Sequence, residues 1–122
     1  MYKNKLLILR ILEILKNESD EEHHLTQQEI LRLLDTGYGI NCDRRSVKSN
    51  IEALIEAGYD IVYEECYYLA SREFDEAELR MMIDSVLFSK TIPVSAAKSL
   101  VKKLSDMGSK YFRPKVSHMD II

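Results

Sequence analysis

The chain has 122 residues, 46% of them apolar, which is enough for a packed core in one domain or in a small domain with an appendage. Two prolines and four glycines favour helices over a β-sandwich or barrel, and a net charge of −3 does not indicate a general affinity for nucleic acid. Cys42 and Cys66 have neither metal-ligand spacing nor a disulfide framework, which indicates reduced thiols in a cytoplasmic protein.

The first predicted helix spans residues 4–17 and is strongly apolar. Little polar surface remains on it, so we expect it to be buried on most sides. Arg10 and Glu13 interrupt the apolar run, which is also too short to cross a bilayer. We therefore expect an interior helix, with neither a signal peptide nor a membrane anchor.

A charged loop follows at residues 17–24, where His23 and His24 lie beside three acidic residues. Such a cluster raises the question of a metal site. Adjacent residues on a loop rarely converge on one ion without partners elsewhere, so we expect a solvated connection and no metal.

A capping box predicts the second helix. Thr26 and Glu29 have the S/T-x-x-E spacing, in which each side chain satisfies a backbone N–H group of the other residue. The helix should end near Gly37, and residues 38–42 form the turn into the next helix. Two short helices joined by a glycine-containing turn are typical of a helix-turn-helix.

The third predicted helix, at about residues 43–57, has sequence signals for both of its ends. Asp43 can cap its first N–H groups, and Gly58 can adopt the left-handed conformation that follows a helix end. Arg45 points away from the apolar stripe, and the first half of this outward face is cationic and hydroxylic. The inward stripe consists of Val47, Ile51, Leu54 and Ile55.

This outward face is the candidate DNA contact surface. Arginine and lysine can reach phosphates or guanine edges, and serine and asparagine can reach phosphates or bases. A recognition helix uses its N-terminal residues in this way, although a solvated helix with ordinary surface charges has the same pattern. Two residues at the start of the second helix join the set. The candidate DNA contacts are Arg44, Arg45, Ser46, Lys48, Ser49, Asn50, Thr26 and Gln27.

Two short strands are predicted next, at residues 60–63 and 66–70, with a turn at Glu64 and Glu65. Three helices followed by a hairpin give a mainly α fold with a small β-hairpin wing, that is, a winged helix-turn-helix. The tip of this wing is acidic, so we expect it to lie away from phosphate.

Two further helices are predicted after the wing. Asp75 and Glu78 form a second capping-box pattern, and the helix that they open should end before Pro93. The last helix runs over about residues 93–104. Residues 111–122 have no period and are predicted to be a tail.

We therefore divide the chain into a winged helix-turn-helix domain at 1–72, a helical linker at 73–110 and the tail at 111–122. The linker has more apolar surface than a small wing domain needs to cover, which predicts a two-fold homodimer that presents two recognition helices. The predicted dimerisation residues are Leu79, Met82, Ile83, Val86, Leu87, Leu100, Val101 and Leu104.

The sequence contains no Gly-rich phosphate loop, no G-x-S-x-G motif and no H-E-x-x-H motif. The paired carboxylates fall on predicted loops and tips, where desolvation cannot tune their pKa values. We expect a protein that is not an enzyme and needs no cofactor.

Over about residues 3–105 the chain resembles the N-terminal region of bacterial WYL-domain transcriptional regulators. The resemblance implies a DeoR-like winged helix-turn-helix that binds double-stranded DNA, with its third helix in the major groove, followed by a helical linker that often serves in dimerisation. The matching residues are Leu25-Thr26, Glu29-Ile30, Leu33-Leu34, Tyr38-Gly39-Ile40, Arg44-Arg45-Ser46-Val47, Ile51, Leu54, Gly58-Tyr59-Asp60-Ile61, Tyr67-Tyr68-Leu69-Ala70, Phe74, Glu78-Leu79 and Ile83-Asp84-Ser85-Val86.

The chain departs from that family at three points. Ser49 and Asn50 stand where the family often has Arg-Asp, the wing is short and acidic, and no counterpart of the WYL effector-sensing domain follows. We expect either a fragment or a short relative that cannot sense the same ligand. Residues 1–70 have 8 basic and 13 acidic residues, a net charge of −5, which favours an alternative. In that alternative, an acidic winged-helix adaptor binds a protein partner and no DNA.

Overall fold

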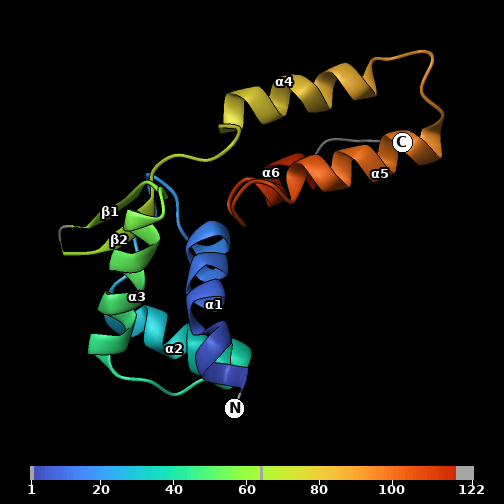
Figure 1. Ribbon diagram of the computed structural model, residues 1–122. Coiled ribbons are helices and arrows are strands. Elements are labelled where there is room, and N and C mark those ends of the chain that lie inside the picture. The colour runs from blue at the N-terminus through green and yellow to red at the C-terminus, as the bar shows by residue number, and fades with distance from the viewer. Residues whose placement is uncertain (1, 64, 118–122) are drawn as a thin grey trace. The chain divides into compact units, whose positions relative to one another are not determined.

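The computed structural model describes residues 2–63 and 65–117. The chain forms two compact units, with the boundary between Arg72 and Glu73, and each is described by itself (Figure 1). The described residues are mainly helical, with one small two-stranded antiparallel sheet. The predicted combination of helices with a β-hairpin is confirmed at this level.

Three helices and the hairpin make up unit 1 (Figure 1): α1 (Tyr2–Glu18), α2 (Gln27–Tyr38) and α3 (Arg44–Glu56). Helix α1 packs against α2, α3 and the second strand. Leu6 and Leu9, on its other side, keep 37% and 52% of their surface exposed. Most of the other described side chains of α1 are buried or half-buried, so the helix is covered on most sides as predicted, and Leu6 and Leu9 mark the strip that stays exposed.

Helix α2 begins at its predicted cap and ends at Tyr38, one residue after Gly37. Thr26 and Glu29 form the capping box, with both side chain to N–H distances at 3.1 Å. The helix continues through Gly37 to Gly39, whose φ of 64° is left-handed. The Gly39 N–H donates to the Asp35 carbonyl at 2.9 Å. The helix thus ends close to Gly37, as predicted, and the residue that takes the left-handed position is Gly39.

Helix α3 ends in a Schellman arrangement. Gly58 has φ 113°, and its N–H donates to the Ile55 carbonyl at 3.0 Å. The N–H of Tyr59 donates to the Leu54 carbonyl at 3.1 Å. Gly58 therefore has the positive φ that the sequence predicted for this position.

The sheet consists of β1 (Ile61–Tyr63) and β2 (Tyr67–Leu69), paired antiparallel with Ile61 opposite Leu69. Leu25, just before α2, extends this sheet by one residue. Its N–H and carbonyl exchange hydrogen bonds with the carbonyl and N–H of Tyr67, at 2.8 and 2.7 Å. The outer edge of β2 is thus paired and is not open to another chain.

The core of unit 1 lies between the three helices and the inner face of the hairpin. It also contains a completely buried hydroxyl, that of Ser19, which donates to the Leu15 carbonyl at 2.6 Å. The buried side chains of this core are Leu7, Ile11, Leu12, Ile14, Leu15, Leu25, Ile30, Leu34, Ile40, Val47, Ile51, Leu54, Ile61, Tyr67 and Leu69.

Unit 2 contains α4 (Glu76–Leu87), α5 (Val94–Ser105) and the short α6 (Arg113–Ser117), with α4 packed against α5. The predicted capping box at the start of α4 is confirmed. The Glu78 N–H donates to Asp75 Oδ1 at 2.8 Å, and the Asp75 N–H donates to Glu78 Oε1 at 3.0 Å.

Part of the segment that was predicted to be a tail belongs to the core of unit 2. Phe112 is fully buried and Val116 is 3% exposed, and both pack with Leu79 and Ile83 of α4. A Cβ added to Gly108 would lie 2.7 Å from Phe112 Cδ2, so the glycine makes room for the ring. Phe112 and Val116 have the i, i+4 spacing of one helical face, but a single such pair is too short to establish a period, which explains the error. The last part of the predicted tail, 118–122, lies outside the described residues.

Candidate nucleic-acid interface

The start of α3 is fixed by Asp43, whose Oδ1 accepts the Ser46 N–H at 2.8 Å. This backbone hydrogen bond is the main reason that the pKa of Asp43 lies below its ordinary value, and the nearby Arg45 contributes less. The side chain is therefore a carboxylate at neutral pH. Its charge favours the N-terminus of the helix and partly offsets the neighbouring arginines.

Four of the candidate contacts lie on the exposed face of the first half of α3: Arg44, Arg45, Lys48 and Ser49. Arg44 Nη2 lies 3.5 Å from Gln28 Oε1 of α2, at the limit of a hydrogen bond. On the opposite face Val47 and Ile51 are at most 1% exposed. The helix therefore separates an apolar inner stripe from a cationic outer surface, as the 100° spacing predicts.

The other four candidates already have partners within the unit. Asn50 Nδ2 donates to the Ser46 carbonyl at 2.7 Å, and both residues are half-buried. The Thr26 hydroxyl accepts the Glu29 N–H in the capping box. Gln27 Nε2 donates to the Tyr67 hydroxyl at 3.1 Å.

The second half of α3 differs in charge and in polarity. Glu52 and Glu56 are exposed, so the cationic surface stops after Ser49. Ile55, predicted to face inward, is 43% exposed. At 100° per residue Ile55 lies 80° away from Val47, at the edge of the stripe, where no neighbouring element covers it.

The hairpin next to α3 has an aromatic surface. Tyr63 is 51% exposed, and its ring stacks on that of Tyr67 at 4.6 Å between centroids. On the other strand, Tyr68 stacks on His24 at 4.0 Å. Burial raises the pKa of the Tyr67 phenol above its ordinary value. Glu65 is exposed, while Glu64, the other predicted tip residue, lies outside the described residues.

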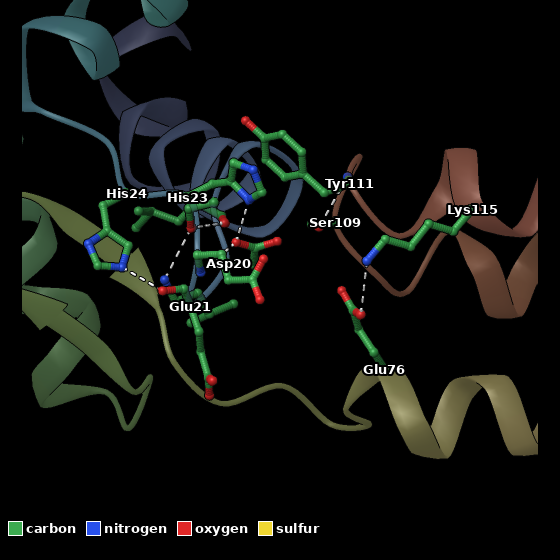
Figure 2. Close-up of polar contacts among 12 residues, drawn as sticks. Asp20, Glu21, His23, His24, Glu76, Ser109, Tyr111 and Lys115 are labelled. Atoms are coloured by element: carbon green, nitrogen blue, oxygen red, sulfur yellow. Dashed lines mark hydrogen bonds and ion pairs between the residues drawn. The ribbon is translucent and has the colours of Figure 1, made fainter.

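The two histidines of the charged loop have local partners (Figure 2). His23 Nδ1 lies 2.8 Å from Asp20 Oδ1, and His24 Nε2 lies 2.8 Å from the Glu21 carbonyl. Over residues 2–63 and 65–117, no three side chains of histidine, cysteine, aspartate or glutamate are grouped so that they could share a metal ion.

The two cysteines are both half-buried and unpaired by a disulfide. Cys42 packs against the core of unit 1, in the turn between α2 and α3. Burial, and then the negative charge of Asp43, raise the pKa of the Cys42 thiol. This thiol is therefore protonated at neutral pH and is a poor nucleophile.

No protein-family model, curated protein or solved structure matches this chain.

The predicted dimerisation stripe is largely covered within unit 2. Leu79 and Ile83 are fully buried and Val101 is 4% exposed, because α5 and the segment around Phe112 pack over them. The half-buried members are Met82, Val86, Leu87 and Leu104. Only Leu100, at 40%, counts as exposed.

Other apolar side chains of unit 2 are more exposed to solvent than the predicted dimerisation residues. Phe88 is 83% exposed and Met81 is 67% exposed. They lie seven residues apart, two turns along α4, on the face away from Leu79 and Ile83. A pair of apolar residues at i and i+7 was the sequence signal for this second face. None of the helices in the described ranges combines the length and apolarity needed to cross a membrane.

Proposed function

We propose that this chain is a sequence-specific DNA-binding transcriptional regulator of the cytoplasm, with unit 1 as a winged helix-turn-helix. In this proposal α2 and α3 are the helix-turn-helix, α3 enters the major groove, and the β1–β2 hairpin is the wing. The resemblance to the N-terminal region of WYL-domain regulators points to the same assignment. The observation that carries this proposal is the exposed cationic surface at the start of α3, where Arg44, Arg45 and Lys48 are all exposed and Arg45 points away from the buried stripe.

The dimensions of α3 suit this role. Thirteen residues give a helix about 20 Å long and 10–12 Å wide, which fits a major groove about 12 Å wide. The charges of α3 favour one orientation in the major groove. Arg45, near the N-terminal end, is attracted to the phosphates that line the groove, and Glu56, at the other end, is repelled by them. The N-terminal end of α3 should therefore lie deepest in the groove.

Homodimerisation remains part of the proposal, because two recognition helices related by a two-fold axis would read two half-sites. The burial of Leu79, Ile83 and Val101 moves the expected contact to exposed apolar residues of unit 2. The candidate contact residues are Leu100 of α5, from the predicted set, and the more exposed Met81 and Phe88.

A second candidate function is an acidic adaptor that binds a protein. The exposed apolar side chains of Ile55, Tyr59 and Tyr63, with the exposed carboxylates of Glu52 and Glu56 on α3, favour this reading. Such a surface suits a protein partner with apolar anchors and basic flanks.

Selection of bound sequences from random duplex DNA at low salt separates the two functions. A regulator enriches a defined sequence, and that sequence then competes better than random DNA for binding. An adaptor enriches none. Sedimentation of the free protein and of the DNA complex measures whether two chains bind together.

A further inference from the structure

The charges of this protein are strongly divided along the chain. Residues 1–87 contain 10 basic and 18 acidic residues, a net charge of −8. Residues 88–117 contain seven basic residues and one acidic residue, a net charge of +6. The most basic segment thus lies in unit 2, outside the helix-turn-helix, and the proposed role of α3 leaves it unexplained.

This positive charge is concentrated on the solvent side of α5. Ala97 and Val101 turn inward, with 7% and 4% of their surface exposed. Lys98, Lys102 and Lys103 are all exposed and lie on the other side, 60° or more from that inward direction. The exposed hydroxyl residues Ser95 and Ser99 lie between them on the same surface. We call these five residues the α5 basic face.

Ion pairing within the unit does not account for these three lysines. Asp106, the acidic residue nearest to them in the sequence, has its Oδ1 atom 4.0 Å from Arg113 Nη1. Glu76 Oε2 lies 3.7 Å from Lys115 Nζ (Figure 2). No carboxylate of residues 2–63 and 65–117 forms an ion pair with the lysines of the α5 basic face. Their charge is therefore available to an outside anion.

Helix stability explains only part of the pattern. Lys102 and Lys103 lie in the last turn of α5, where a positive charge interacts favourably with the helix dipole. Lys98 lies in the second turn of the helix, outside the last turn, so the helix dipole gives no reason for a cation there.

We propose that the α5 basic face binds the phosphate backbone of duplex DNA, as a second contact that is independent of base sequence. Lys98, Lys102 and Lys103 lie within about 7.5 Å along the axis of α5. Their flexible stems allow the ammonium groups to reach several phosphates of a duplex from this one surface. The hydroxyl groups of Ser95 and Ser99 are suitable donors to the phosphate oxygens between the lysines.

This contact rests on the proposed function, because both take duplex DNA as the partner. It adds the non-specific affinity for DNA that α3 lacks. Unit 1 is acidic as a whole, so α3 alone gains little non-specific affinity. The α5 basic face supplies that affinity, while α3 supplies the choice of sequence. The two contributions differ in their dependence on salt and on sequence.

The test is a salt titration of the full-length chain against duplex DNA of random sequence, followed by fluorescence anisotropy. The variant Lys98→Gln/Lys102→Gln/Lys103→Gln removes three positive charges. We expect the slope of log K against log salt to fall by about 2 to 3 units, since each phosphate contact contributes about 0.9. Lys98→Gln alone, outside the last turn of α5, should lower it by about 0.9.

The matched control is Lys5→Gln/Lys16→Gln/Lys90→Gln, which removes the same charge from exposed positions outside α5. It should leave the slope within about 0.5 units of wild type, far from the change expected of a lost phosphate contact. Replacement of the three lysines of the α5 basic face by arginine should preserve the slope. Circular dichroism verifies that all variants are folded.

The outcomes separate this inference from the proposed function. If α5 variants keep the wild-type slope while Arg45→Ala reduces binding to a selected sequence, the α5 contact is wrong and the regulator proposal stands. If wild type shows no sequence preference but the α5 variants have a smaller salt slope, the α5 contact is supported and the regulator proposal is wrong. If the α5 variants abolish only self-association at low salt, measured by sedimentation, the lysines pair with an acidic surface of a second copy and the inference is overturned.

Discussion

The buried hydroxyl of Ser19, at the end of α1, accepts the backbone N–H of Leu69 in β2 at 3.1 Å. Together with the pairing of Leu25 and Tyr67, this hydrogen bond satisfies backbone groups on the outer edge of β2. The carbonyl of Ser19 also accepts a hydrogen bond from Arg72 Nη2 at 2.6 Å. One residue thus joins the first helix, the hairpin and the last residue of unit 1.

Ser19→Ala should therefore destabilise unit 1. It leaves the buried N–H of Leu69 without its acceptor, which costs about 1–3 kcal/mol in free energy of unfolding. Urea denaturation followed by circular dichroism measures the change. Ser71→Ala is the control, since its hydroxyl makes an exposed hydrogen bond to Asp60 and its loss should cost less than about 0.5 kcal/mol. Equal effects of the two substitutions would show that Ser19 does not hold the strand.

The two glycines Gly108 and Gly37 should respond to alanine in opposite directions. At Gly108 the new Cβ would lie 2.7 Å from the buried Phe112 ring, and such overpacking costs about 1–3 kcal/mol. At Gly37, inside α2, a Cβ meets no atom within 4 Å. Alanine there should stabilise the helix by about 0.4–1 kcal/mol. Thermal unfolding of both variants gives the comparison, and a neutral Gly108→Ala would mean that the Phe112 ring is not packed against this turn.

The sequence predicted what depends on neighbours along the chain. The Thr26–Glu29 and Asp75–Glu78 capping boxes, and the exposure of Arg45, all follow from local spacing and the helical repeat. Contacts between distant residues were not predictable in this way. The burial of Phe112 depends on α4, the role of Ser19 depends on β2, and neither leaves a periodic signal.

The candidate site shows the same division. Its exposed cationic residues follow from the helical repeat. The bond from Asn50 to the Ser46 carbonyl, and that from Gln27 to Tyr67, were not foreseen. Residue type indicates that an amide can reach DNA, but only the structure shows that it is already hydrogen-bonded within the protein.

Stability should fall at alkaline pH through Tyr38. Burial first, and then its hydrogen bond to Glu13 Oε2 at 3.1 Å, raise the pKa of this phenol above 10.0. The folded state thus holds the proton more tightly than the unfolded state. The stabilisation is fully present below pH 10 and is lost as pH rises from there through the folded-state pKa.

Tyr38→Phe removes that titration, so its free energy of unfolding should decline less steeply above pH 10 than that of wild type. Tyr59→Phe is the control, because it also removes one phenol but from an exposed residue. Urea denaturation at several pH values gives both slopes. A Tyr38→Phe slope identical to wild type would contradict the proposed linkage.

The proposed function makes its sharpest prediction at Arg45 and Lys48 of α3. Both side chains are exposed, and Arg45 points directly away from the buried stripe. With α3 in a major groove, Arg45 is best placed for a base edge, so Arg45→Ala should cost about 1–3 kcal/mol on the selected sequence and relax specificity there. Lys48, on the flank, is placed for phosphate. Lys48→Ala should weaken binding to all sequences alike and lower the salt slope by about one unit.

Fluorescence anisotropy with the selected duplex and a random duplex, at two salt concentrations, distinguishes these effects. Both substitutions should change thermal stability by less than about 0.5 kcal/mol, because neither side chain packs in the core. Glu56→Ala is the control on the same helix: it removes an exposed charge at the far end and should not reduce DNA affinity. If wild type binds no duplex better than random DNA even at about 50 mM salt, a concentration at which phosphate contacts are strong, the cationic face of α3 is not a DNA-reading surface. The adaptor function, with Ile55, Tyr59 and Tyr63 as its contact residues, then replaces it.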